Sequence, residues 1–342
     1  MRILLDGMGG DNSPEEIVKG AVLAAAEIEE TVAILGPEDV IKEQLKKNHW
    51  KGNNIEVINA NEVITNDEAP SKAIRRKKDS TIVKGINMLK DGEADALISA
   101  GSTGALLTGG LLILGRIPGI KRPAIASWFP NVGMDGNTLL LDCGANADSK
   151  PEYLYQNGVM GSIYVKSIKG IESPVVKLLN IGAEDEKGDE LHKDAFKLLD
   201  QSDLNFQGNI EGRDVVFGEA DVCVADGFSG NVFLKGAEGV ALSIMKLFKS
   251  KLTEGVVAKA GAMLAYNKIK DIKKEFDYSD AGGAPILGVK GAILKIHGNS
   301  KAREVYYAIL KAIPYIEDNV TGTIAAAFAK DENINGGSES NE

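Results

Sequence analysis

Short apolar runs that end in polar, glycine-rich segments recur along the chain, and they constrain its fold more than any other feature. Runs at 2–5, 96–99, 139–141, 177–180 and 222–225 alternate with stretches of helical periodicity as far as about residue 329. Such alternation is typical of βαβ units, in which helices join parallel strands. The pattern predicts an α/β protein with three αβα layers around a mainly parallel sheet.

A loop of small and polar residues follows each of these apolar runs. Ligands of open parallel sheets bind beyond the carboxyl ends of the strands, where such loops meet. We therefore expect the loops to gather at one edge of the sheet and form a site, although a glycine can also serve only to close a tight βα turn. The loops are Gly7–Asp11, Gly101–Gly104, Asp142–Asn146, the residues around Gly182, and Asp226–Asn231.

The first of these loops leads into residues that favour the start of a helix. Pro14 is suited to a first helical position, Ser13 to the cap before it, and Glu16 to the third position after the cap. A strand, a glycine turn and a helix N-terminus together form a common anion-binding arrangement. An oxygen-rich anion is therefore the expected ligand.

Well-known cofactor and nucleophile motifs are not present. The segment from Gly7 has Asn12 where the dinucleotide fingerprint needs its third glycine, and no Gly-Lys dipeptide is present for a Walker A loop. Residues 227–231 lack the last glycine of a nucleophile elbow. The chain has only three histidines, so a covalent mechanism that needs a histidine base has little support. We expect neither a cofactor nor a metal site.

Charge and composition exclude further classes of protein. Basic residues number 39 and acidic residues 49, and the formal net charge of −10 disfavours binding to nucleic acid. No apolar stretch reaches the roughly 20 residues of a membrane span, and the first residues do not resemble a signal peptide. Cys143 and Cys223 lie in apolar runs, as reduced core cysteines do. A cytoplasmic protein is expected.

Two basic segments stand out against the acidic whole. Arg75, Arg76, Lys77 and Lys78 are consecutive, and they form either a solvated helix face or a contact for an anionic partner. Residues 246–274 hold eight lysines and two acidic residues, and 255–266 within them are apolar nearly all round. That stretch is a buried helix, a dimer contact, or a tip that inserts into an anionic membrane surface. The candidate membrane contacts are Val257, Met263 and Leu264.

The loop sequences are specific enough to compare with a known family. They are Asp6-Gly-Met-Gly-Gly-Asp11, Ser99-Ala-Gly-Ser-Thr-Gly-Ala105, Leu141-Asp-Cys-Gly-Ala-Asn146, Leu178-Leu-Asn-Ile-Gly-Ala-Glu184 with Lys187-Gly188, Asp226-Gly-Phe-Ser-Gly-Asn231, and Gly282-Gly-Ala-Pro-Ile-Leu-Gly288. In this order, over about residues 1–328, they resemble the bacterial phosphate acyltransferases, the PlsX family.

The resemblance implies a homodimeric enzyme with a fold like that of isocitrate and isopropylmalate dehydrogenases, without nicotinamide chemistry. The enzyme would transfer a fatty acyl group from acyl-[acyl carrier protein] to inorganic phosphate. The acyl phosphate would then serve phospholipid synthesis through a membrane glycerol-3-phosphate acyltransferase of the PlsY type. We expect residues 1–330 to form one large catalytic domain of one or two lobes, with a helical excursion at about 245–275, and residues 331–342 to form a disordered tail.

The chemistry implied by the resemblance assigns roles to several residues. A thioester is already activated and phosphate is a competent nucleophile, so we expect direct attack, assisted by groups that hold phosphate and stabilise an oxyanion. The resemblance supports Lys187 and Asn231 as catalytic; by itself, Lys187 fits a solvated loop lysine among acidic neighbours. Asp6, Asp11 and Asp226 are expected to orient their loops through hydrogen bonds to the backbone. The candidate phosphate- and substrate-binding residues are Asp6, Gly9, Gly10, Asp11, Ser102, Thr103, Gly104, Asn146, Asp226, Ser229 and Gly230.

Other functions are open at this point. A phosphotransacetylase-like exchange with coenzyme A thioesters would place the same demands on the site. A non-enzymatic scaffold for lipid synthesis would need only the apolar tip and its partners. A dehydrogenase is disfavoured by the broken fingerprint.

Overall fold

The computed structural model describes residues 1–133, 136–275 and 282–335. Its strands are β1 (Arg2–Asp6), β2 (Thr31–Gly36), β3 (Ile55–Asn59), β4 (Ala96–Ser99), β5 (Ala124–Pro130), β6 (Asn137–Leu141), β7 (Val176–Asn180), β8 (Phe206–Glu211), β9 (Val222–Val224), β10 (Ala284–Leu287) and β11 (Ala292–Lys295). Its helices are α1 (Glu15–Ala25), α2 (Glu38–Lys47), α3 (Pro70–Arg76), α4 (Thr81–Lys90), α5 (Thr103–Gly109), the π-helical turn η1 (Gly110–Leu114), α6 (Pro151–Lys169), α7 (Glu190–Asp200), α8 (Gly212–Val215), α9 (Gly227–Leu252), α10 (Val256–Leu264), α11 (Tyr266–Glu275), α12 (Ala302–Glu317) and α13 (Val320–Asn335).

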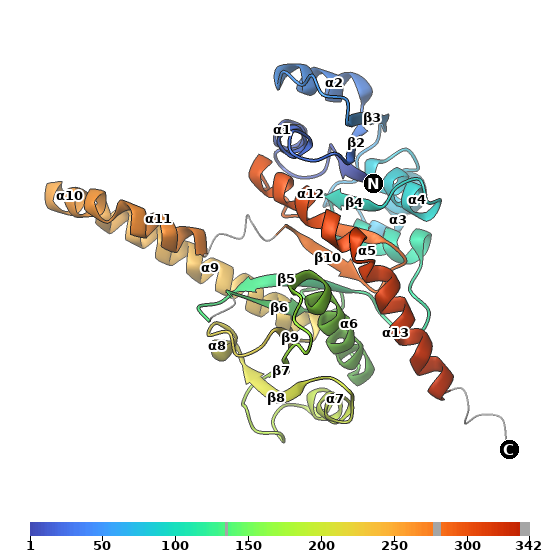
Figure 1. The fold of residues 1–342 in the computed structure, drawn as a ribbon, viewed down its shortest axis with the longest axis vertical. Helices are drawn as coiled ribbons and strands as arrows, with labels where there is room; N and C mark the ends of the chain where they lie inside the picture. The colour runs from blue at the N-terminus through green and yellow to red at the C-terminus, as the bar shows by residue number, and fades with distance from the viewer. Residues whose placement is uncertain (134–135, 276–281, 336–342) are drawn as a thin grey trace.

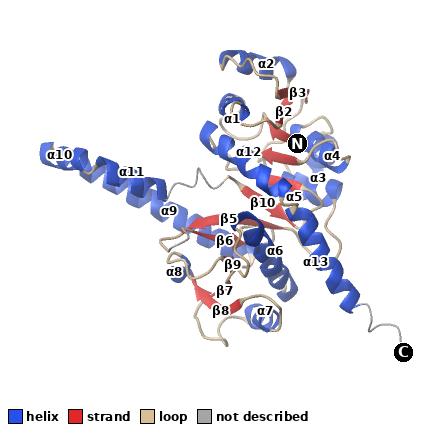
Figure 2. Cartoon of the chain, in the orientation of Figure 1, coloured by secondary structure: helices blue, strands red, loops and turns tan. Residues whose placement is uncertain are grey.

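One sheet runs through the described residues, in the order β3-β2-β1-β4-β11-β10-β5-β6-β9-β7-β8. Helices cover both of its faces (Figure 2). Side chains alternate between the faces, because successive residues of a strand point to opposite sides. In β1, Ile3 and Leu5 join one buried cluster with residues of α1, α6 and α12, whereas Leu4 joins the other cluster with residues of α4 and α5. The expected three-layer α/β fold with a mainly parallel sheet is thereby confirmed.

The direction of the strands differs from the expectation of a single functional edge. The strands β3, β2, β1, β4 and β11 are parallel to one another, and so are β6, β9, β7 and β8. Between these two sets, β11 pairs with β10, β10 with β5 and β5 with β6, each antiparallel. The two sets therefore run in opposite directions, and the carboxyl ends of their strands do not share one edge of the sheet.

The long helix α9 and the helices α10 and α11 extend from the body of the protein (Figure 1). The apolar stretch at 255–266 contains the whole of α10, and it is not a buried helix within the chain. Val256, Val257, Met263 and Leu264 are 85%, 87%, 80% and 92% exposed. None of the helices in the described residues is both long enough and apolar enough to span a membrane.

Two local expectations are corrected. Helix α1 begins at Glu15 with Pro14 at the cap position, and Ser13 does not cap it. Instead the Ser13 hydroxyl donates hydrogen bonds to the carbonyl oxygens of Met8 at 2.9 Å and Gly10 at 2.8 Å, and so closes the first loop on itself. At the other end, α13 continues to Asn335, into the segment that we expected to be a disordered tail, and 336–342 lie outside the described residues.

Candidate active site

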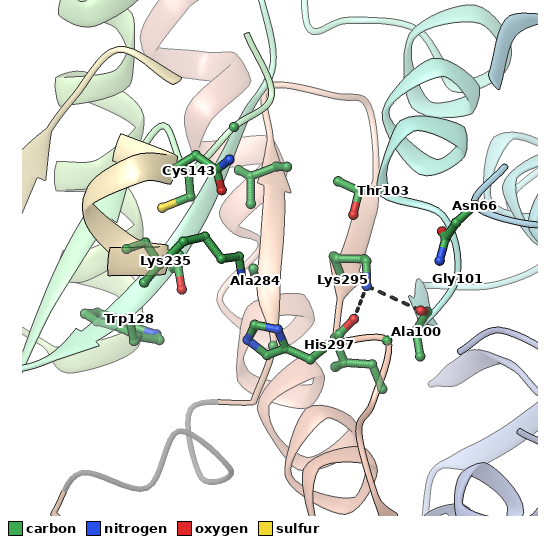
Figure 3. Close-up of a pocket in the computed structure, with 18 residues that line it drawn as sticks. Asn66, Ala100, Gly101, Thr103, Trp128, Cys143, Lys235, Ala284, Lys295 and His297 are labelled. Atoms are coloured by element: carbon green, nitrogen blue, oxygen red, sulfur yellow. Dashed lines mark hydrogen bonds between the residues drawn. The ribbon is translucent and has the colours of Figure 1, made fainter. Parts of the chain in front are cut away.

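A cavity of about 430 Å³ lies where the two parallel sets of strands meet. Figure 3 shows Lys295 and His297 near its centre, Lys235 and Cys143 on one side, and Thr103 and Asn66 on the other. The lining residues are Asn66, Ala100, Gly101, Thr103, Ile125, Ser127, Trp128, Cys143, Gly144, Asn231, Leu234, Lys235, Gly283, Ala284, Lys295, Ile296, His297 and Gly298. The cavity thus draws on segments that are far apart in the sequence.

Lys295 is the last residue of β11, and its half-buried side chain enters the cavity. Its ammonium group donates hydrogen bonds to the carbonyl oxygens of Ala100, at 3.4 Å, and of Ile296. Burial lowers the pKa of Lys295 to about 8, although the carboxylates of Asp6 and Asp11 favour its charged form. A cation that carbonyl groups hold in place and that is poorly solvated is suited to bind an anion.

Two further nitrogen bases face the same space. Lys235 on α9 pairs with Glu238 at 2.9 Å, and His297 Nε2 lies 3.7 Å from the other oxygen of the same carboxylate. Partial burial lowers the pKa of His297, while Glu238 opposes this effect. Among the residues that the structure describes, no group of three or more His, Cys, Asp or Glu could hold a metal ion.

The start of α9 brings Asn231 to the cavity wall. Asp226 caps this helix and accepts hydrogen bonds from the backbone N–H groups of Phe228 at 3.0 Å and Ser229 at 2.9 Å. Gly230 packs so closely on the loop after β6 that a Cβ atom would lie 2.1 Å from the carbonyl oxygen of Asp142. This close approach allows Asn231 to line the cavity.

The loop after β6 is held by the buried carboxylate of Asp142. It accepts hydrogen bonds from the backbone N–H groups of Ile125 at 3.1 Å, Ala145 at 2.9 Å and Asn146 at 2.9 Å. Burial raises the pKa of Asp142, and these hydrogen bonds oppose the rise. The side-chain amide of Asn146 donates to Asp142 at 3.0 Å and to the carbonyl of Pro123 at 2.9 Å. Asn146 therefore shapes this loop and is not among the lining residues.

The first loop supports the cavity wall from behind. The carboxylate of buried Asp6 accepts a hydrogen bond from the Ser99 hydroxyl at 2.6 Å, and Ser99 in turn accepts one from the N–H of Gly101 at 2.9 Å. A Cβ atom on Gly9 would lie 2.6 Å from the nitrogen of Gly101, so only glycine fits there. The N–H of Asp11 donates to the carbonyl of Gly298 at 2.7 Å.

Gly10 has a φ of +91°, and a Cβ atom on it would lie 2.7 Å from the carbonyl oxygen of Gly298. None of Asp6, Gly9, Gly10 and Asp11 lines the cavity. The first loop therefore positions the residues that do.

The second loop begins α5 at the cavity edge. Thr103 lines the cavity, whereas the hydroxyl of Ser102 caps α5 by accepting a hydrogen bond from the N–H of Ala105 at 3.4 Å. A Cβ atom on Gly104 would lie 2.7 Å from Cγ of Pro70, so the start of α3 packs directly on the start of α5.

Lys187 lies apart from the residues that line this cavity. It follows β7, its side chain is 47% exposed, and its ammonium group is 3.9 Å from the carboxylate of Glu184. The neighbouring helix α7 carries His192, whose Nε2 lies 3.7 Å from the carboxylate of Asp226. Helix α7, which follows the Lys187 loop, is thus linked to the cap of α9.

Comparisons with known proteins identify the family of this chain. A family model described as "Fatty acid synthesis protein" matches residues 1–323. A curated protein of Clostridium acetobutylicum, named "Phosphate acyltransferase", is 47% identical over 326 residues, which cover 95% of this chain and 98% of that protein. The chain belongs to the phosphate acyltransferase family. The family identified from the loop sequences is confirmed.

Solved structures resemble this phosphate acyltransferase in fold. A phosphotransacetylase from Streptococcus pyogenes aligns with a TM-score of 0.62 and 21% identity, over 93% of this chain and 94% of that one. A 4-hydroxythreonine-4-phosphate dehydrogenase from Klebsiella pneumoniae aligns with a TM-score of 0.51 and 12% identity, over 95% and 99%. At these identities the similarity concerns the fold alone.

Three charged or titratable residues of the cavity lining were not predicted from the sequence. They are Lys235, Lys295 and His297. Lys295 ends a short apolar run, as the other candidates do, but the run at 292–294 was not among those considered. Lys235 lies on the third turn of α9, beyond the loop that we singled out. A search for the first polar residue after every apolar run would have found Lys295.

Proposed function

We propose that this protein transfers a fatty acyl group from acyl-[acyl carrier protein] to inorganic phosphate and so produces acyl phosphate for phospholipid synthesis. Membership of the phosphate acyltransferase family makes it an acyltransferase. The observation that carries the proposal is the cavity in which Lys235 and Lys295 face Thr103 and Asn231. Phosphate and a developing oxyanion are both stabilised by cations and by uncharged hydrogen-bonding groups, and this cavity has both.

In the proposed reaction, phosphate binds beside Lys295 and Lys235, with Thr103 as a further donor. A phosphate oxygen attacks the thioester carbonyl carbon, and the new C–O bond gives a tetrahedral oxyanion. When this intermediate collapses, the C–S bond breaks and the thiolate of the carrier leaves. We assign Asn231 to the oxyanion, and Lys187 to phosphate or the oxyanion.

The state of Cys143 supports direct attack by phosphate. Cys143 is one of the lining residues, and its thiol donates a hydrogen bond to the carbonyl of Leu140 at 3.3 Å. Burial, and to a lesser extent the carboxylate of Asp142, raise the pKa of Cys143 well above its usual value. A thiol is a weak nucleophile in its protonated form, so an acyl-cysteine intermediate is disfavoured here.

The activity is tested with long-chain acyl-[acyl carrier protein] and phosphate, with hydroxylamine to trap the acyl phosphate. We expect hydroxamate that depends on phosphate, formed faster than with the same concentration of acyl-coenzyme A. Faster turnover of the coenzyme A thioester would favour the phosphotransacetylase-like alternative. No phosphate-dependent product from either donor would favour a non-enzymatic scaffold.

We further propose that residues 1–330 act as one catalytic domain with a fold of the isocitrate and isopropylmalate dehydrogenase type. A single sheet through the described residues supports one unit, and its two parallel sets correspond to two lobes. Similarity in fold to a phosphotransacetylase and to a dehydrogenase supports the fold type.

We also propose that the protein is a homodimer. A groove of about 990 Å³ along α9 is lined almost wholly by apolar side chains, among them Phe129, Val240, Ile244 and Phe248. Large exposed apolar patches mark interaction sites, and most soluble oligomers are symmetric homo-oligomers. Sedimentation of the protein in buffer should give twice the mass of one chain; the mass of a single chain would contradict the proposal.

The tip of the helical excursion is proposed to contact an anionic membrane, where a membrane glycerol-3-phosphate acyltransferase of the PlsY type would take up the product. The substitutions Val257→Glu and Leu264→Glu together should release the protein from anionic vesicles, because they place charge on side chains that are nearly fully exposed. Activity in solution should not change. Flotation with vesicles measures binding, and Leu112→Glu, at an exposed apolar residue on η1, is the control.

If the double variant floats with vesicles as the unsubstituted protein does, α10 is not the membrane contact. The proposal places the protein in the cytoplasm, peripherally bound to the membrane through this tip.

A further inference from the structure

One side of α3 carries basic side chains that the described part of the chain does not neutralise. Ala73 and Ile74 are buried against the body, while Lys72, Arg75 and Arg76 are exposed. Lys72 and Arg76 are four residues apart and so lie on the same side of the helix. Within residues 1–133, 136–275 and 282–335, no ion pair reaches these three side chains.

The neighbouring lysines differ from each other. Lys77 donates to the carboxylate of Glu68 at 2.6 Å and to the carbonyl of Val63 at 2.7 Å, and it is partly buried. Glu68 therefore neutralises the charge of Lys77 within the fold. Lys78 is exposed and donates only to the carbonyl of Ile74, at 3.3 Å. We call the exposed set Lys72, Arg75, Arg76 and Lys78 the α3 basic face.

This face lies beside the cavity. Asn66, shortly before α3, lines the cavity, and Pro70 at the start of α3 packs on Gly104 of α5. Helix α3 has only seven residues and spans roughly 10 Å at 1.5 Å per residue. All of the α3 basic face is thus within about two helical turns of residues at the cavity edge.

In the other basic segment, the lysines on α9 and α10 lie farther from the cavity. From Asn231 to Leu252, α9 extends roughly 30 Å at 1.5 Å per residue, and α10 begins beyond its end. Helix α10, with its lysine Lys259, therefore lies at the tip of the helical excursion (Figure 1). A partner that must deliver a thioester to Lys295 gains little from docking there.

We propose that the α3 basic face is the docking surface for the acidic acyl carrier protein, an inference that rests on the proposed function. The chain has a net charge of −10, so an acidic partner is repelled by most of its surface. Unpaired cations beside the cavity attract that partner and orient it, an effect that acts mainly on the rate of association and that salt weakens. Docking here brings the thioester to the cavity mouth.

The test compares two charge reversals of equal size. The variant Lys72→Glu/Arg76→Glu alters the α3 basic face, and Lys246→Glu/Lys249→Glu alters exposed lysines of α9 in the other basic segment. At low salt, the α3 variant should raise the KM for acyl-[acyl carrier protein] by roughly tenfold to a hundredfold. Its KM for phosphate and its Tm should match those of the unsubstituted protein, and the α9 variant should keep both KM values.

Salt gives a second measurement. The KM for acyl-[acyl carrier protein] should rise with ionic strength in the unsubstituted protein and in the α9 variant, and change little in the α3 variant. If the KM for acyl-[acyl carrier protein] is unchanged in the α3 variant, or rises equally in both variants, the α3 basic face is not the docking surface. Neither result would contradict the activity itself. Absence of phosphate-dependent product from the unsubstituted protein would instead refute the proposed function.

Discussion

Lys295→Ala should lower kcat/KM for phosphate by about a hundredfold to a thousandfold, the range observed when one donor to a reacting oxyanion is removed. The ammonium group is partly desolvated and is held by the carbonyl oxygens of Ala100 and Ile296, so water replaces it poorly. Steady-state kinetics with phosphate as the varied substrate measure the loss. Lys290→Ala, at an exposed residue of the β10–β11 turn, is the matched control and should leave kcat/KM unchanged.

The pKa of Lys295 predicts that the KM for phosphate depends on pH. Its pKa of about 8 means that half of the free enzyme carries the charge at pH 8 and that less carries it above. The KM for phosphate should therefore rise as the pH increases from 7 to 9, because binding requires the charged form. In Lys295→Arg the guanidinium stays charged, so its KM should change little over this range. An unchanged KM for phosphate in Lys295→Ala would remove Lys295 from the phosphate site.

Asn231→Ala and Lys187→Ala should each lower turnover by about tenfold to a thousandfold, with a Tm close to that of the unsubstituted protein. Asn231 is the uncharged polar residue through which α9 meets the cavity, beside the charged Lys235, and its loss removes a donor to the proposed oxyanion. Lys187 has an exposed side chain, so its loss should not affect folding. Turnover at saturating substrate and thermal unfolding are the measurements.

Lys193→Ala, at an exposed lysine of α7, is the control for Lys187 and should have normal turnover. Near-normal turnover in both Asn231→Ala and Lys187→Ala would exclude them from the mechanism. If turnover falls in Asn231→Ala but not in Lys187→Ala, Lys187 takes no part in the reaction, and the reaction takes place in the cavity around Lys295.

The strands β1, β4, β6, β7 and β9 were predictable from the sequence because each is a short run of mostly buried, apolar residues that leads into a glycine-containing loop. Strand direction was not predictable. A short apolar run does not reveal which neighbour it pairs with, and β10 and β5 become antiparallel partners only in the tertiary structure. The expectation that all of the loops share one edge failed for this reason.

The candidate site was predictable in part. Thr103 and Asn231 lie at the cavity, and each stands beside a glycine at the start of a helix, which is a local feature of the sequence. Lys235 reaches it by helical periodicity from Asn231, and Lys295 by pairing of β11 with β4, which is a long-range contact. Ser13 fits a helix cap by its position, yet α1 begins after Pro14, and the Ser13 hydroxyl instead donates to carbonyl groups of the first loop.

The central place of β11 in the sheet has a consequence for how the chain is made. A ribosome releases β4 and β5 long before β10 and β11, which lie between them. Until residues 284–295 emerge, β4 and β5 each have an edge without its partner strand. Unpaired strand edges can pair with other chains and cause aggregation. The nascent chain cannot complete the proposed phosphate site in that interval, because Lys295 is part of the strand that joins the two halves.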